Sequence, residues 1–194
     1  MDGGTLGGWA MTNSYDAFGR RTNFTLNTPS LTQYQFTYDN ASRLATVKDG
    51  TYSVNYSYLA NSPLVSQISY RQGNSVWMTT SKQYDNLNRL TNLSSTHAGP
   101  LPTCFAYQYS DANQRTRLTL ADGSYWTYQY GSLGQLSSGK RSWSDQVPVA
   151  GQQFENVFND IGDRTSTKEG GDASGGGCGR APTVRVCRIQ ARAR

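Results

Sequence analysis

The sequence Tyr15-Asp16-Ala17-Phe18-Gly19-Arg20 decides the fold, because the same pattern returns at regular intervals along the chain. It recurs as Tyr38-Asp39-Asn40-Ala41-Ser42-Arg43 and again as Tyr84-Asp85-Asn86-Leu87-Asn88-Arg89. Weaker copies begin at four further aromatic residues, which are Tyr58, Tyr109, Tyr130 and Phe158. The seven starting points are 20 to 28 residues apart, with a mean near 24. A period of this length is typical of arrays in which one small structural unit is repeated.

Each copy carries turn-forming residues at fixed distances from its aromatic residue. The fourth residue after the aromatic is always Gly, Asn or Ser: Gly19, Ser42, Ser62, Asn88, Asn113, Gly134 and Gly162. The residue directly after the aromatic is an acceptor for a nearby backbone N–H in five copies: Asp16, Asp39, Asp85, Ser110 and Asn159. Leu59 and Gly131 are the two exceptions. The pattern therefore predicts a tight turn in every repeat.

The segments that lead into these turns alternate between aromatic and small polar residues. Tyr34, Phe36 and Tyr38 fall on one face of a predicted strand, and the intervening Gln and Thr residues fall on the other. Similar rows are Tyr52/Val54/Tyr56/Tyr58, Phe105/Tyr107/Tyr109 and Trp126/Tyr128/Tyr130. Asp49-Gly50, Gly73-Asn74 and Asp122-Gly123 are hairpin signals between such segments. Each repeat is therefore predicted to be a two-stranded antiparallel unit.

The composition agrees with an all-β chain that has many reversals. Only 16% of the residues are charged, against about 25% in an ordinary soluble domain. Ser, Thr, Asn and Gln together number 67, and aromatic residues make up 12%. Tyr and Thr favour strands, while Gly, Asn and Ser favour turns. The fold class that we predict is all-β, with antiparallel β-hairpin repeats forming a curved or spiralling open sheet.

The Tyr-Asp-x-x-Gly-Arg pattern resembles the YD-repeat family, also called rearrangement-hotspot (Rhs) repeats, over about residues 9–170. The stretch from Tyr125 to Gln135 is similar to the bacterial branch of that family. The resemblance implies a long β-strip that spirals into a hollow shell, which in bacteria encloses a toxic C-terminal domain. The conserved segment that follows the repeats in the family, and that releases the toxin by aspartyl autoproteolysis, has no counterpart here. Seven repeats are also too few to close a shell, so the resemblance implies a fragment of the wall.

The predicted domain organisation has three parts. Residues 1–8 are expected to be a flexible N-terminus, residues 9–170 the repeat region, and residues 171–194 a Gly-rich linker followed by a disordered Arg-rich tail. The repeat region would form an open sheet with exposed edges, and exposed edges favour self-association. No stretch approaches the length of about 18 apolar residues that a membrane-spanning helix needs. The start of the chain also lacks the features of a signal peptide, so secretion or surface location is implied only by the family.

The formal charge of +5 comes from the tail, not from the repeats. Residues 178–194 contain five Arg and no acidic residue, so the 13 remaining Lys and Arg balance the 13 Asp and Glu of residues 1–177. This distribution argues against a basic nucleic-acid-binding domain. Two interpretations of the tail remain open: a short basic arm, or sequence from a shifted reading frame. A third, the start of a toxin domain, would need far more than 17 residues.

Few residues in the chain are candidates for catalysis or metal binding. His97 is the only His and is expected in a solvated loop at residues 94–102. One His, and one Cys outside the C-terminal tail, are too few for a His/Cys metal cluster. With its single His expected in a solvated loop, the chain is also not expected to hold a standard His-based triad with Cys104 or a Ser. Cys104, Cys178 and Cys187 are odd in number and widely spaced, which predicts incidental thiols and no disulfide framework. The glycines of residues 3–8 lack the Lys-Ser/Thr pair of a phosphate loop, so no cofactor is expected.

The repeated carboxylates are the remaining chemical feature. Asp16, Asp39 and Asp85 occupy equivalent turns, each followed by an Arg, and residues about 24 positions apart along a strip do not converge on one substrate. We therefore interpret them as turn-capping acids. Residues 159–163 are the nearest match to a calcium loop, but Glu169 is the only acidic residue among the eight residues that follow them. We expect no catalytic, cofactor-binding or metal site.

These observations predict a non-enzymatic structural module. By resemblance, it would contribute to the wall of an encapsulating shell in an exported bacterial protein, with the remaining repeats, a core segment and a toxin cargo as partners. The alternative is a surface adhesion or carbohydrate-binding module that uses its aromatic rows. The aromatic rows can equally serve to pack the sheet through cross-strand pairs, which is the interpretation that we favour.

Overall fold

The computed structural model describes residues 2–6, 9–27, 31–97, 102–171 and 178–180, and these residues form strands and turns with no helix. The chain divides into two compact units, Met1–Pro102 and Thr103–Arg194. The strands of the first unit are β1 (Asp2–Leu6), β2 (Trp9–Tyr15), β3 (Arg21–Asn27), β4 (Leu31–Tyr38), β5 (Leu44–Asp49), β6 (Tyr52–Tyr58), β7 (Val65–Gln72), β8 (Ser75–Tyr84) and β9 (Leu90–His97). The strands of the second unit are β10 (Thr103–Tyr109), β11 (Arg115–Leu120), β12 (Tyr125–Tyr130), β13 (Leu136–Ser142), β14 (Pro148–Phe158), β15 (Arg164–Glu169) and β16 (Cys178–Arg180).

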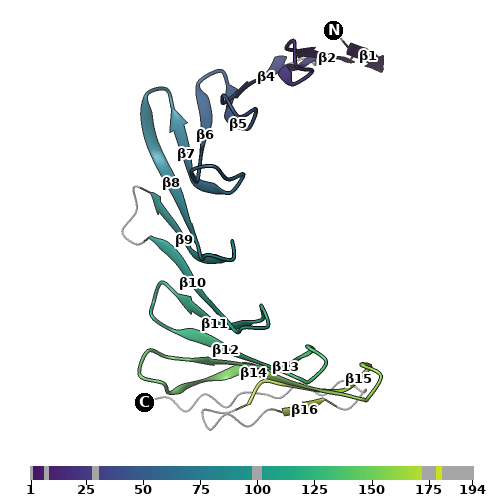
Figure 1. The fold of residues 1–194 in the computed structure, drawn as a ribbon, viewed down its shortest axis with the longest axis vertical. Coiled ribbons are helices and arrows are strands. Elements are labelled where there is room, and N and C mark those ends of the chain that lie inside the picture. Colours follow the sequence, from purple (N-terminus) through teal and green to yellow (C-terminus); the bar gives the residue numbers. More distant parts are fainter. Residues whose placement is uncertain (1, 7–8, 28–30, 98–101, 172–177, 181–194) are drawn as a thin grey trace. The chain divides into compact units, whose positions relative to one another are not determined.

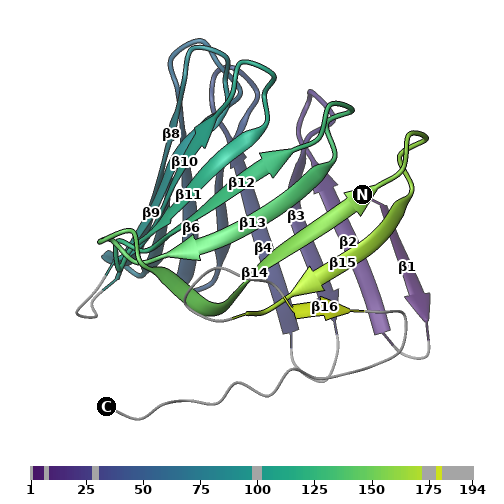
Figure 2. The ribbon, with the colours of Figure 1, turned by 90° about the horizontal axis from the view of Figure 1, so that it is seen from below.

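Within each unit, every strand pairs antiparallel with the strand that follows it in the chain (Figures 1 and 2). Among the described residues, strands contact only their neighbours in sequence, so each unit is an open strip. The predicted all-β class with antiparallel hairpin repeats is confirmed. Hairpins also form at the three predicted turns, between β5 and β6, β7 and β8, and β11 and β12.

The seven repeat aromatics all occupy the same place in this architecture. Tyr15, Tyr38, Tyr58, Tyr84, Tyr109, Tyr130 and Phe158 are the last residues of β2, β4, β6, β8, β10, β12 and β14. Two strands lie outside the repeat region predicted for residues 9–170, because β1 precedes it and β16 follows it. The tail residues 172–177 and 181–194, which we expected to be disordered, lie outside the described residues.

A β-bulge follows the turn in every repeat, and the sequence pattern did not predict it. In the second repeat Thr37 pairs with Thr46 while Tyr38 pairs with Leu44, so Ala45 has no opposite residue. The same shift recurs beside each of the other six aromatics. The seven extra residues are all small or hydroxyl-bearing: Thr22, Ala45, Ser66, Thr91, Thr116, Ser137 and Thr165. Bulges increase the local twist of a strand pair, so the repeat builds a regular twist into each strip.

The strips have one aromatic face and one polar face, as the alternation predicted. Along β4, the Tyr and Phe side chains are half-buried and the Gln and Thr side chains between them are mostly exposed. Cross-strand contacts join aromatic side chains on that face, for example Phe24 and Tyr34 with ring centroids 6.3 Å apart. However, no hydrophobic side chain among the described residues is fully buried. The aromatic side chains therefore pair across strands, as we predicted, but among the described residues no second layer covers them.

Candidate functional site

The repeat turn recurs in all seven copies within this chain. In the first copy, the Asp16 N–H donates to the Arg20 carbonyl at 2.9 Å and the Gly19 N–H donates to the Asp16 carbonyl at 3.0 Å. These bonds enclose a three-residue hairpin loop whose last residue, Gly19, has φ of 74°. A type I turn closed by a left-handed residue is a common way to make such a loop. Equivalent N–H···O=C pairs close the other six turns.

The left-handed residue follows the predicted slot in six copies: Gly19, Ser42, Asn88, Asn113, Gly134 and Gly162. In the third copy it is Asn61, with φ of 54°, not the predicted Ser62. The Leu59 N–H there donates to the Leu64 carbonyl, so this turn contains one more residue than the others. Asn accepts positive φ more readily than Ser does, which explains why the extra residue shifts the left-handed position by one.

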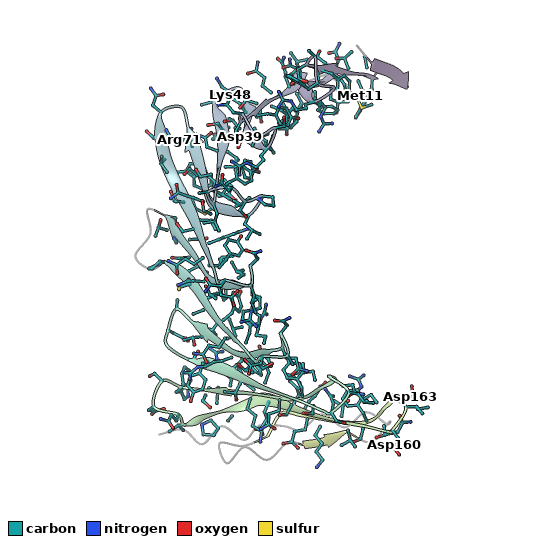
Figure 3. All side chains as sticks on the ribbon, in the orientation of Figure 1. Met11, Asp39, Lys48, Arg71, Asp160 and Asp163 are labelled. Atoms are coloured by element: carbon teal, nitrogen blue, oxygen red, sulfur yellow. The ribbon has the colours of Figure 1, made fainter. Side chains whose placement is uncertain are left out.

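The Asp of each full copy caps its own turn. Asp16 Oδ1 accepts hydrogen bonds from the Phe18 and Arg20 backbone N–H groups, both at 2.9 Å. Asp16 Oδ2 accepts a third from Arg20 Nε at 2.7 Å. Asp39 and Asp85 repeat the arrangement with Arg43 and Arg89, at 2.7 and 2.6 Å. One carboxylate therefore fixes both the backbone of the turn and the direction of the arginine (Figure 3 labels Asp39).

These contacts lower the pKa of the turn carboxylates below the ordinary value of 3.8. For Asp16 and Asp85, partial desolvation raises the pKa, but the hydrogen bonds from the following Arg and from the N–H two residues on outweigh it. For Asp39, the backbone N–H of Arg43 is the largest influence and lowers the pKa directly. Hydrogen bonds from charged donors stabilise the ionised carboxylate.

We expect the stability of the repeats to fall in acid through these three carboxylates. A pKa that is lower in the folded chain means that the unfolded chain binds more protons, so the carboxylates stabilise the fold above pH 3.8 and lose this effect as the pH falls further. Urea midpoints measured at pH 6 and pH 3 check this. The triple variant D16N/D39N/D85N should show a smaller difference between the two midpoints, and an unchanged difference would contradict the assignment.

The turn arginine links each repeat to the next one. Arg20 places its guanidinium carbon 4.6 Å from the ring centroid of Tyr38, the aromatic of the second repeat. It also donates from Nη1 to Ser42 Oγ at 2.9 Å, in the next turn. Arg43 does the same one repeat later, 4.4 Å from the Tyr58 ring and with a hydrogen bond to the Ser62 carbonyl. Each arginine therefore makes an ion pair within its own turn and a cation–π contact with the following one.

The repeat tyrosine forms a second link in the opposite direction. Tyr38 Oη donates to the Arg21 carbonyl at 2.9 Å, and Tyr58 Oη donates to the Leu44 carbonyl at 2.7 Å. Tyr84 and Tyr130 make the equivalent bonds to the Val65 and Arg115 carbonyls. The acceptor always lies beside the bulge of the preceding repeat. Burial raises the pKa of Tyr58 and of Tyr84, so these hydroxyls remain protonated donors.

The weaker copies in the second unit keep the geometry with different side chains. Gln114 and Gln135 replace the turn arginine, and their amide nitrogens lie 3.5 and 3.4 Å from where a Cβ on Gly134 and on Gly162 would be. Phe158 lacks the hydroxyl of the repeat tyrosine. Asn156, two residues earlier, donates from Nδ2 to the Leu136 carbonyl at 3.1 Å in its place.

A separate polar cluster braces the opposite ends of the strands in the second unit. Arg141 on β13 donates to Ser124 Oγ at 2.8 Å, to Asp122 Oδ2 at 3.1 Å and to Gln152 Oε1 at 2.9 Å. Ser124 is fully buried and in turn donates to Asp122 Oδ1 at 2.6 Å. This hydrogen bond is the main cause of the lowered pKa of Asp122. The cluster links the β11–β12 turn to β13 and β14, and nothing in the sequence pattern indicated it.

The sequence-predicted candidates lie on strands or in a repeat turn of their own units. His97 is the exposed last residue of β9 and pairs with Met78, so the prediction that it lies in a loop was wrong. Cys104 is half-buried in β10, while Cys187 lies outside the described residues. In residues 159–163, Asn159 Oδ1 accepts the Asp163 N–H at 2.8 Å, and Figure 3 shows Asp160 and Asp163 at this turn.

The described residues contain neither a metal-ligand cluster nor a membrane-spanning helix. No three His, Cys, Asp or Glu side chains lie close enough together to hold a metal ion in the part of the chain that the structure describes. The same residues contain no helix of a length and apolarity that would cross a membrane. Asp16, Asp39 and Asp85 each form an ion pair with the Arg of their own turn.

Comparison with known proteins identifies the repeat. The family model described as RHS Repeat matches residues 109–144, which hold the copies beginning at Tyr109 and Tyr130. The prediction that the chain carries Rhs repeats is therefore confirmed. No curated protein matches the chain.

Several solved structures of toxin complexes match the chain, each with a TM-score below 0.5. The crystal structure of TcdB2-TccC3-Cdc42 is 13% identical, with a TM-score of 0.48 and coverage of 84% of this chain and 10% of that one. The crystal structure of TcdB2-TccC3 is 13% identical, with a TM-score of 0.49 and coverage of 84% of this chain and 11% of that one. A Photorhabdus luminescens Tc holotoxin pore with a mutated TccC3 is 14% identical, with a TM-score of 0.47 and coverage of 84% of this chain and 10% of that one. The chain thus spans about a tenth of the length of these proteins.

Proposed function

We propose that the chain is a wall segment of an Rhs-type shell in an exported toxin-delivery protein, and that it catalyses no reaction of its own. The coarser statement, that it is a structural Rhs-repeat module, follows from the matched repeats. The observation that carries the finer proposal is the serial link between repeats. Arg20 and Arg43 each contact the next repeat, and Tyr38 and Tyr58 each contact the preceding one.

Contacts between consecutive repeats are typical of the wall of an extended repeat array and not of a self-contained domain. Every repeat depends on its neighbours for its contacts, so the strip can be extended by adding further copies. The described residues have no buried hydrophobic core that would limit its length. The half-buried aromatic face supplies an apolar lining on one side of the strip. The partners would be further repeats of the same protein and the cargo that the shell encloses.

The four Asp residues with lowered pKa values also have structural partners that account for them. The three repeated Asp residues are bound to their own turns, and Asp122 is bound to Ser124 and Arg141. Their lowered pKa values favour the charged form that caps a turn, whereas a general acid needs a raised pKa. This supports a structural role for the most regular charged groups of the chain.

Grafting tests the proposal directly. Residues 9–171 would replace seven consecutive repeats in the wall of a complete Rhs-type protein, and electron microscopy would show whether the shell still closes. We expect a closed shell that protects its cargo from protease. The matched control graft carries R20A/R43A, which removes the two arginines that contact the next repeat, and it should assemble poorly. A soluble graft that never closes would overturn the proposal.

The alternative adhesion function predicts a different result. Binding of the isolated chain to sugars on a glycan array, lost on replacing exposed aromatic residues such as Trp9 or Tyr52, would favour a carbohydrate-binding module. We expect no such aromatic-dependent binding, because the aromatic side chains already contact one another and the turn arginines.

A further inference from the structure

A hollow of about 400 Å³ lies between the last two repeat turns of the second unit. One wall is the turn of the sixth repeat, with Leu133 and Gln135, and the other is the turn of the seventh, with Phe158 and Asp160. Ser137 and Asn156 form part of its floor. The hollow therefore lies at the junction where one repeat should contact the next.

The first unit shows what normally occupies this junction. Gln135 is the fifth residue after its aromatic, the position that Arg20 and Arg43 hold in their repeats. Phe158 corresponds to Tyr38 and Tyr58, the rings that lie 4.6 and 4.4 Å from those guanidinium carbons. The same chain thus presents two examples of a guanidinium group between consecutive turns.

At the junction of the sixth and seventh repeats, the neighbouring turns are present but the guanidinium group is replaced by the Gln135 amide. Gln135 is shorter and uncharged, and its amide reaches toward Gly162. Asn156 has already replaced the tyrosine hydroxyl as the donor to the Leu136 carbonyl, so that carbonyl needs no further donor. The amide oxygens of Asn156 and Asn159 already accept hydrogen bonds from Thr167 Oγ1 and the Asp163 N–H. What the hollow still offers is the Phe158 ring, the Gln135 amide oxygen and the exposed carboxylate of Asp160, which forms no ion pair with any described residue.

We propose that this hollow binds the guanidinium group of an arginine side chain from outside the two turns. The Phe158 ring offers the face that Tyr38 and Tyr58 offer to Arg20 and Arg43, and Asp160 supplies the negative charge. A planar guanidinium can stack on the ring and donate to a carboxylate at its edge, whereas an ammonium group does this less well. The arginine can come from residues 180–194 of this chain, which hold five Arg, or from another polypeptide.

Titration of the full chain with L-arginine amide tests the site. Backbone amide shifts of Gly131, Gly134 and Gly162, followed by NMR, should saturate in the millimolar range. Citrulline amide has the same shape without the charge, and it should bind at least about threefold more weakly because it loses both the cation–π contact with Phe158 and the ion pair with Asp160. Q135R should abolish binding by supplying the arginine internally. Q83R adds the same charge at an exposed position on β8 and should leave binding unchanged.

A second arm identifies the source of the arginine. The variant R180S/R185S/R188S/R192S/R194S should bind arginine amide more tightly than the parent chain if an arginine of the chain's own C-terminal residues occupies the hollow, and equally tightly if the arginine belongs to another polypeptide. The proposal is overturned by non-saturating shifts, by equal affinity for citrulline amide, or by undiminished binding to Q135R. Each of these results leaves the wall function open, because shell closure in the graft is measured independently of this site.

Discussion

G139A should destabilise the second unit by about 1 to 3 kcal/mol, the usual cost of forcing an extra carbon into a packed position. Gly139 is a buried residue of β13 and pairs with Phe154 on β14. The Phe154 ring lies directly over it, so an added Cβ would come within 2.4 and 2.5 Å of two ring carbons. The ring must then move away and lose its contact with Trp126, whose centroid lies 6.3 Å from its own.

A double-mutant cycle isolates this clash from the general effect of replacing a glycine. Gly139 has no positive φ, and Ala is better suited than Gly to a strand interior by about 0.5 to 1 kcal/mol. In an F154A background, G139A should therefore be neutral or stabilising, and the sign of its effect should reverse. Urea unfolding followed by tryptophan fluorescence measures all four chains. An equal loss of stability in both backgrounds would refute the role of the Phe154 ring.

G131A is the matched glycine control for this experiment. Gly131 also lacks positive φ, and an added Cβ there would meet the end of the flexible Gln135 side chain at 3.2 Å, with the Gln135 carbonyl oxygen at an ordinary contact distance of 3.9 Å. We expect a change of less than about 1 kcal/mol, in the stabilising direction, because alanine restricts the unfolded chain.

The repeat period, the hairpins and the position of each aromatic could be predicted because residues close together in the sequence determine them. Asp16 and Gly19 are recognisable as turn residues from their chemistry alone, and the spacing between copies gives the order of strands. The interpretation of Asp16 as a turn cap agrees with its hydrogen bonds to Phe18 and Arg20.

The inter-repeat contacts could not be predicted in the same way, because they join residues about 20 positions apart. The direction of Arg20 toward Tyr38 depends on strand register, which the bulge at Thr22 shifts by one residue. Small residues recur at the bulge position, but Ser and Thr are common throughout this chain and do not stand out there.

The third repeat shows a related limit of pattern reading. Pro63 adds a residue to the turn, and the left-handed position moves from the predicted Ser62 to Asn61. The replacement of a tyrosine hydroxyl by the Asn156 amide is a similar case, since the donor lies two residues from the expected position. In both cases the hydrogen-bond requirement is retained while the residue that satisfies it changes.

G131D/Q135R should stabilise the junction of the sixth and seventh repeats by about 1 to 2 kcal/mol. The two substitutions convert residues 130–135 into the full Tyr-Asp-x-x-Gly-Arg pattern of the first repeat. The backbone is already suited to it, because the Gly131 N–H donates to the Gln135 carbonyl at 2.8 Å and the Gly134 N–H donates to the Gly131 carbonyl at 2.9 Å. The sum combines an ion pair of about 0.2 to 1 kcal/mol, a cation–π contact of about 0.5 to 1 and the loss of a glycine from the unfolded chain.

The two substitutions should support each other, which distinguishes a rebuilt turn from two independent surface changes. G131D alone places a carboxylate in the turn without its arginine, and Q135R alone lacks the carboxylate that directs Arg20 in the first repeat. Hydrogen exchange of the Gln129, Val157 and Asn159 amides reports the opening of this junction. The coupling should shrink in 1 M salt, because an exposed ion pair is screened. G131D/Q135K should gain less, since lysine lacks the planar group that stacks on Phe158, and strictly additive single effects would show that the turn had not been rebuilt.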